Sequence, residues 1–221
     1  MLSEVWQVAW FTVRMAAFAT VLMLPIGVVL GWWLARSRSV GTLLVETLVS
    51  LPLVMPPVAI GFMLIWLFGS YGPLGPLLEG FGIELVYTWK AVVVAMVIIG
   101  MPLLVRTART GFEQRTLRYE QVASTLGAGP LRVFFTISLP LAYRSLLAGT
   151  VLAFSRALGE FGATFMIAGN IPGRTQTLST AIYSHAESGR DMIAGGLLLI
   201  SIAIAFLAIL VSNWLTPRHT Q

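Results

Sequence analysis

The chain has 221 residues, of which 57% are hydrophobic and only 10% are charged, and its mean hydropathy is +0.86. Soluble domains carry roughly 25% charged residues, so this composition excludes an ordinary soluble protein and indicates an integral membrane protein. The absence of cysteine excludes disulfides, zinc–thiolate sites, iron–sulfur clusters and thiol nucleophiles. The formal net charge is +5, and all but one of the 14 basic residues are arginines.

Five apolar stretches are long enough to cross a bilayer. A helix rises about 1.5 Å per residue, so it needs about 20 apolar residues to cross the hydrocarbon layer. We expect an all-α integral membrane protein with one domain, 1–221, and spans at about 5–35, 43–68, 85–105, 141–168 and 192–215. Prolines inside the first two spans predict kinks. A cleaved signal peptide is rejected because no cation precedes the apolar run, which continues far past any cleavage site.

The positions of the basic residues predict how the chain is oriented. If the N-terminus lies outside, the turn at 36–42, the segment 106–140 and the C-terminus are cytoplasmic. Eight cations then lie inside and three outside: Arg36, Arg38, Arg106, Arg109, Arg115, Arg118, Arg132 and Arg218, against Lys90, Arg174 and Arg190. An excess of arginine and lysine marks the cytoplasmic side, so the N-terminus is expected outside and the C-terminus inside.

The segment 106–140 contains a short amphipathic helix followed by a turn. Its apolar residues recur at positions i, i+3, i+4 and i+7: Tyr119, Val122, Ala123 and Leu126. Gly127 occupies the place where a left-handed residue ends a helix, and Gly129 followed by Pro130 predicts the start of the next helix. The helix is too short to span, so it either rests on lipid headgroups or docks on another molecule.

The fourth expected span carries the polar residues Arg156, Glu160 and Thr164 at intervals of four, which places them on one stripe of a continuous helix. A charge in hydrocarbon costs at least a few kcal/mol, so the stripe should face protein or water. Two compatible interpretations are an Arg–Glu pair that holds helices together and a role in a pathway or gate. Gly159 and Gly162 favour close backbone approach and flexibility.

Two further features lie outside the fourth span. Leu178, Ala181, Ile182 and His185 have helical spacing, which predicts a short helix at the outer surface. Arg14 and Glu46 are interpreted as snorkelling or ion-paired side chains.

The segment 119–140 resembles the cytoplasmic loop signature of ABC importer permeases: Glu-Ala-Ala, three residues, Gly, nine residues, Ile-x-Leu-Pro. The matching residues are Ala123, Gly127, Ile137, Leu139 and Pro140. The chain departs from the signature at the acidic position, where Gln121 stands and Glu120 lies one place earlier, and at Val122, which replaces the first alanine. The resemblance implies a coupling helix that seats on a separate ATPase subunit through Tyr119, Glu120, Gln121, Val122, Ala123, Leu126 and Gly127.

The stretches "RALGEFGAT" and "GNIPGRTQTL" resemble the corresponding region of bacterial molybdate/tungstate permeases, and sulfate/thiosulfate permeases share the Gly-Glu-Phe-Gly-Ala portion. The resemblance implies a type I ABC importer permease fold in the bacterial inner membrane. It implies a homodimer with its pathway on the two-fold axis, two ATPase subunits below it, an extracytoplasmic oxyanion-binding protein above it, and no nucleic-acid partner.

The polar residues and glycines in and after the fourth expected span are candidate residues for transport. The candidate pathway or gate residues are Ser155, Arg156, Gly159, Glu160, Gly162 and Thr164. Asn170, Arg174 and Gln176 either meet the binding protein or are simply solvated.

The chain itself is expected to bind no cofactor or metal and to be no enzyme. It has no G-x-x-x-x-G-K-[ST] motif, so the partner ATPase must bind ATP and Mg. An intramembrane enzyme is disfavoured because H-E-x-x-H and G-x-S-x-G are both missing. A secondary transporter is the remaining alternative, but no inverted repeat or intramembrane carboxylate relay is evident.

Overall fold

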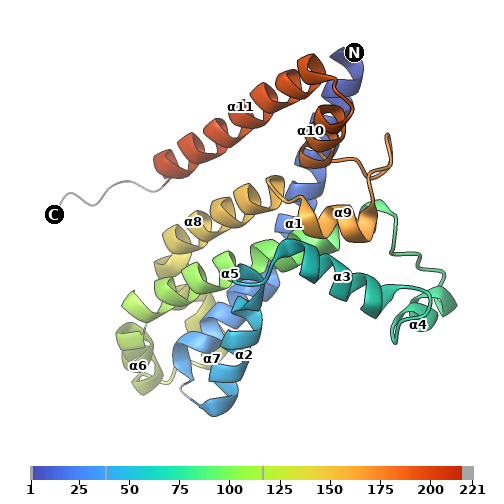
Figure 1. The fold of residues 1–221 in the computed structure, drawn as a ribbon. Coiled ribbons are helices and arrows are strands. Elements are labelled where there is room, and N and C mark those ends of the chain that lie inside the picture. The colour runs from blue at the N-terminus through green and yellow to red at the C-terminus, as the bar shows by residue number, and fades with distance from the viewer. Residues whose placement is uncertain (1, 38, 116, 216–221) are drawn as a thin grey trace.

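The fold is seen in a computed structural model that describes residues 2–37, 39–115 and 117–215, and all regular elements in these ranges are helical (Figure 1). Arg38 and Arg218, two of the arginines that predict the orientation, lie outside the described residues. The elements are α1 Leu2–Arg36, α2 Val40–Ser50, the 3-10 helix η1 Leu51–Leu53, α3 Pro57–Phe68, α4 Gly75–Gly80, α5 Trp89–Arg115, α6 Leu117–Thr125, α7 Pro130–Val133, the π-helical segment η2 Phe134–Ser138, α8 Leu139–Leu158, α9 Gly162–Ala168, α10 Leu178–Glu187 and α11 Asp191–Leu215.

Four helical stretches of the described chain are long and apolar enough to cross a membrane: Glu4–Arg36, Trp89–Glu113, Pro130–Leu158 and Asp191–Val211. A fifth candidate is the pair formed by 40–53 and 57–68, whose two halves meet at an angle of 113°. The prolines of the second span lie at this bend, which confirms the kink predicted there, whereas α1 continues through Pro25. The expected all-α membrane fold is confirmed.

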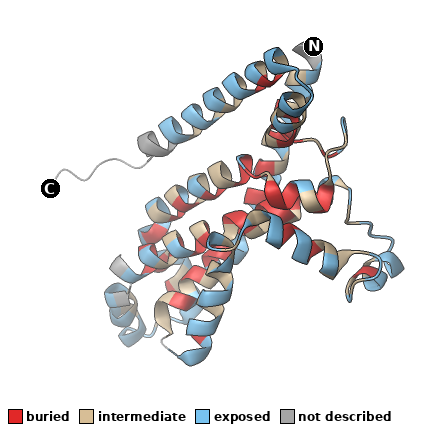
Figure 2. Ribbon diagram, viewed as in Figure 1, coloured by how far each residue is buried: buried red, intermediate tan, exposed pale blue. Residues whose placement is uncertain are grey.

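Helix α5 is the centre of the molecule. Its apolar window is 61% buried within the chain, against 11% for α11 (Figure 2). Both α1 and α8 lie against α5, whereas α11 packs on α10, α8 and α1 (Figure 1). The largest buried side chains of the main core come from α1, α3, α5 and α9: Met23, Ile60, Leu64, Met96, Ile99, Leu104 and Ile167.

The crossing of α1 and α5 depends on two glycines four residues apart. A Cβ atom on Gly27 would lie 2.5 Å from the Leu104 side chain, and one on Gly31 would lie 2.6 Å from Cβ of Ala108. Small residues at this spacing let two membrane helices approach until their backbones nearly touch. A side chain at either position would therefore force the two helices apart.

The fourth expected span, 141–168, is not one continuous helix. Helix α8 ends at Leu158, and α9 begins at Gly162. The carboxylate of Glu160 accepts a hydrogen bond from the backbone N–H of Ala163 at 2.8 Å, so the side chain satisfies a free donor in the first turn of α9. The break allows α9 to pack on α3, where a Cβ on Gly162 would lie 3.0 Å from Pro57.

Candidate functional site

The turn after α6 has the conformation that its glycine predicts. Gly127 has φ +82°, its N–H donates to the Ser124 carbonyl, and the N–H of Ala128 donates to the Ala123 carbonyl at 3.1 Å. These two bonds form a Schellman motif, which requires a left-handed residue after the helix. Helix α7 then begins at Pro130, as predicted. The local geometry of the loop is confirmed.

Helix α6 presents its apolar residues outward instead of packing them on its own chain. Tyr119, Val122 and Leu126 are 60%, 55% and 82% exposed. Among the α6 residues whose side chains the structure describes, only Glu120 and Ala123 are half-buried, and the others are exposed. A contiguous apolar surface of this kind marks a contact with lipid or with another protein.

Glu120 is the one acidic side chain of α6 that points toward the body of the molecule. Its carboxylate accepts hydrogen bonds from the guanidinium of Arg36, at the end of α1, and from the hydroxyl of Ser138, just before α8. The family resemblance assigns Glu120 to the contact with the ATPase, but the structure turns its carboxylate toward residues that are 18 and 84 positions away along the chain.

The candidate gate residues meet at the break between α8 and α9. Arg156 and Glu160 form an ion pair at 3.1 Å in which the Glu160 side chain is 1% exposed and that of Arg156 is 33% exposed. The pairing holds, but the expected continuous stripe is wrong, because Glu160 lies in the break and Thr164 lies on the next helix. Thr164 is fully buried, and its hydroxyl has no hydrogen-bond partner.

Two of the remaining three candidates at this break are more accessible. Ser155 is half-buried near the end of α8, and Gly159 is exposed directly after that helix. Gly162 is instead buried where α9 crosses α3.

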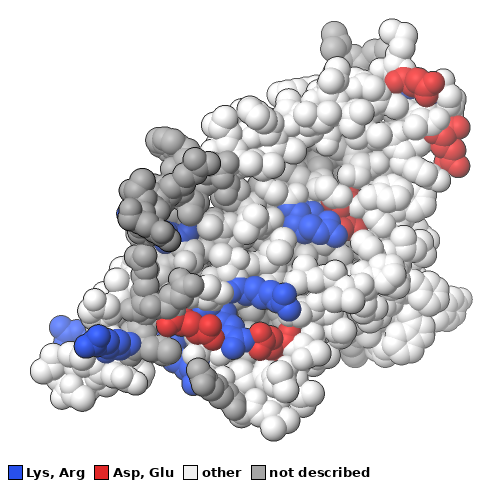
Figure 3. Space-filling model, turned by 60° about the vertical axis from the view of Figure 1, so that its left-hand side comes forward, with Lys and Arg blue, Asp and Glu red and all other residues white. Residues whose placement is uncertain are grey.

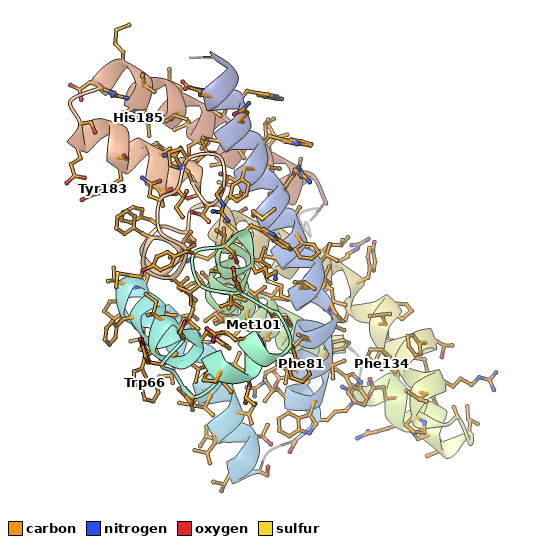
Figure 4. All side chains as sticks on the ribbon, turned by 90° about the vertical axis from the view of Figure 1, so that its right-hand side faces the viewer. Trp66, Phe81, Met101, Phe134, Tyr183 and His185 are labelled. Atoms are coloured by element: carbon orange, nitrogen blue, oxygen red, sulfur yellow. The ribbon has the colours of Figure 1, made fainter. Side chains whose placement is uncertain are left out.

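The outer candidates lie on the loop between α9 and α10. Arg174 is exposed, whereas Asn170 and Gln176 are half-buried, and the N–H groups of Arg174 and Gln176 both donate to the Ile171 carbonyl. Helix α10 follows at the predicted place. Its Tyr183 and His185 lie at one end of the molecule, and Phe134, which belongs to η2 beside α6 and α7, lies at the other end (Figure 4). The structure brings the outer loop and the α6 region to opposite ends.

Charged side chains are few on the surface, and several lie beside a charge of opposite sign (Figure 3). Arg109 pairs with Glu46 and, at 2.7 Å, with Glu113, so the expected pairing of Glu46 is confirmed. Within the described ranges no three His, Asp or Glu side chains lie close enough to hold a metal ion.

Residues 27–221 match the family model described as the binding-protein-dependent transport system inner membrane component. The chain belongs to this permease family. The permease is 41% identical to the molybdenum transport system permease protein ModB of Escherichia coli K12 over 212 residues, which cover 95% of this chain and 93% of that one. The Haemophilus influenzae ModB is also 41% identical, with 88% and 86% covered, and the sulfate transport system permease protein CysT of Salmonella typhimurium is 35% identical, with 95% and 76% covered.

Solved structures show the same fold at low sequence identity. A chain of a bacterial alginate ABC transporter, in complex with an alginate-bound periplasmic protein, matches with a TM-score of 0.74 at 16% identity and covers 97% of this permease and 79% of that chain. A chain of the MetNI methionine ABC transporter matches with a TM-score of 0.70 at 16% identity, with 98% and 94% covered. The permease therefore has the type I ABC importer permease fold.

Proposed function

We propose that this permease is the membrane-spanning subunit of an ATP-driven importer of a tetrahedral oxyanion, with molybdate, or its close analogue tungstate, as the substrate. The observation that carries the proposal is the 41% identity, over nearly the whole chain, to permeases named for molybdenum transport. The sulfate permease is less similar, at 35%. Sulfate or thiosulfate is therefore the second candidate substrate.

The exposed apolar face of α6 supports a cytoplasmic contact with an ATPase subunit. A short helix that is held at both ends and is apolar on its outer side can move with a groove on the partner. The difference in its contact energy between two states of the partner is then passed to the membrane helices. The arginine count supports a cytoplasmic position for this loop, with the N-terminus outside. The chain has no phosphate-binding loop of its own, so ATP and Mg bind to the ATPase.

In this proposal the transport pathway lies between the two copies of a homodimer. Two copies related by a two-fold axis would enclose a path that the described helices of one chain do not enclose alone. The break between α8 and α9 supplies a gate, because Glu160 ties Arg156 of one helix to the first turn of the next. The outer loop at Asn170, Arg174 and Gln176 would meet the binding protein, which selects the ion.

The experiment is uptake into proteoliposomes that contain the permease, with and without its ATPase subunits, binding protein in the external medium and ATP inside. We expect radiolabelled molybdate to accumulate only with ATP and both partners, and tungstate to compete better than sulfate. Uptake driven by an ion gradient without ATPase would contradict the importer assignment. Stronger competition by sulfate would instead shift the substrate to the second candidate.

A further inference from the structure

We propose that Arg36 is a positioning residue that ties α6 to α1 through Glu120, so that a displacement of α6 moves the membrane helices with it. The proposal rests on the proposed function, in which α6 receives the movement of an ATPase. We call Arg36, Glu120 and Ser138 the α6 clamp. Because Glu120 is one place away from the acidic residue of the family signature, the clamp follows from contacts in the structure and not from that signature.

Arg36 is held in place by its own helix. Its Nη1 donates to the Trp32 carbonyl at 2.7 Å, and the guanidinium lies 4.3 Å from the centre of the Trp32 ring. The second guanidinium nitrogen, Nη2, is then left to face Glu120 and also lies 3.4 Å from the Ser138 hydroxyl. A planar guanidinium fixed in this way loses little further freedom when it binds a carboxylate.

One oxygen of the Glu120 carboxylate joins three elements. It accepts from Arg36 on α1 and from Ser138, which is 1% exposed and lies at the end of η2, directly before α8. The side chains of Arg36 and Glu120 are only 22% and 12% exposed, so solvent screens this ion pair less than one on the surface. The contact therefore connects α6 with the starts or ends of two membrane helices.

An aromatic cluster packs beside the α6 clamp. The rings of Trp32 and Phe134 are 5.3 Å apart in an edge-to-face arrangement, and Phe112, which is fully buried, lies 6.4 Å from Phe134. The guanidinium of Arg36 lies 5.8 Å from the Phe112 ring. Since these rings come from α1, α5 and η2, the clamp stands on a packed and rigid base.

No other described side chain anchors α6 inward by a polar contact. The hydroxyl of Ser124 donates to the Glu120 carbonyl, and that of Thr125 donates to the Val122 carbonyl, so both bond within α6. Without the clamp, α6 would remain connected mainly through the chain at its two ends. The ATPase could then still move α6, but less of that movement would reach α1 and α8.

The test compares Glu120→Gln with Glu113→Gln in the full complex, in proteoliposomes, with molybdate as the transported ion. Glu113 is a matched control because it also pairs with an arginine, Arg109, but it is 41% exposed and its ion pair lies within α5. We expect Glu120→Gln to lower the molybdate imported per ATP hydrolysed by about tenfold, which corresponds to roughly 1.4 kcal/mol. Glu113→Gln should keep this ratio within about twofold.

The reversed pair Arg36→Glu with Glu120→Arg tests whether the contact itself matters. We expect it to recover part of the import lost in either single variant, because the two charges again attract. No recovery, together with equal proportional losses of ATP hydrolysis and import in Glu120→Gln, would overturn the proposal, because Glu120 would then act on the ATPase directly. If Glu120→Gln does not assemble, Ser138→Ala takes its place with an expected loss of about threefold, and unchanged coupling overturns the proposal.

Failure of the clamp is distinguishable from failure of the proposed function. If the unaltered complex imports molybdate only with ATP, the function stands whatever the clamp variants do. If the unaltered complex shows no ATP-driven import, the proposed function fails before any variant is compared.

Discussion

Replacing Gly127 with valine isolates the effect of one backbone angle on coupling. Gly127 has φ +82°, a region in which a β-branched residue is a rare outlier. A Cβ atom on Gly127 would meet no atom within 4 Å, so the substitution creates strain without a steric clash inside the chain. Gly129 is the matched control, since its Cβ would also meet nothing within 4 Å while its φ is −67° and its ψ is 156°.

The left-handed conformation costs a non-glycine residue about 1–2 kcal/mol. A change of this size lowers the ratio of ordered to disordered turn by a factor of roughly 5–30. We expect Gly127→Val to reduce ATP-driven molybdate uptake by about that factor, whereas Gly129→Val, in an extended backbone that suits valine, keeps most of it. Gly127→Asn should lie between them, because asparagine tolerates the left-handed region.

The assay is uptake by the full complex in proteoliposomes, accompanied by thermal melting of the permease in detergent. Melting should change little in all three variants, since α6 lies at the edge of the fold. Equal losses of uptake in Gly127→Val and Gly129→Val would refute the reasoning, because added bulk on the loop and not the angle would then be responsible. Full uptake by Gly127→Val would refute the role of the turn altogether.

Two other predictions concern the packing of the membrane helices. Gly31→Ala should destabilise the permease by about 1–3 kcal/mol in thermal melts, because the new Cβ would lie 2.6 Å from Cβ of Ala108. The control Gly41→Ala, whose Cβ would meet only Ser39 at 3.7 Å, should be neutral or slightly stabilising. Equal melting of the two variants would contradict the α1–α5 contact. Thr164→Val removes a buried hydroxyl without a partner, so the melting temperature should stay unchanged or rise. A loss of uptake in a stable Thr164→Val variant would assign that hydroxyl to the pathway. A lower melting temperature would contradict the buried environment.

The parts of the fold that follow from local rules could be predicted from the sequence. The turn at Gly127 and the helix start at Pro130 depend on the angles that glycine and proline adopt, and these need no knowledge of the rest of the chain. The bend of the second span follows from its prolines, and α10 follows from the spacing of its apolar residues. Each of these signals spans about ten residues or fewer.

The parts that depend on distant contacts could not be predicted. The apolar run from 141 to 168 gives no periodic sign of a break, which in the structure is accompanied by the cap that Glu160 makes on α9 and by the packing of Gly162 against α3. The spacing of Gly27 and Gly31 is visible in the sequence, but their partner on α5 is not. The pairing of Arg36 with Glu120 joins residues 84 positions apart and has no local signal.

Of the four long candidate spans in the described chain, α11 buries the least of its surface against the other helices, and this makes it responsive to the thickness of the bilayer. Its candidate span of 21 residues, Asp191–Val211, has a length of about 32 Å, close to the roughly 30 Å of hydrocarbon in a typical membrane. A helix held by few neighbours adjusts to a thinner membrane by tilting, at a cost of fractions of a kcal/mol per ångström. Lipid acyl-chain length is therefore expected to set the angle of α11 well before it disturbs α1, α5 or α8.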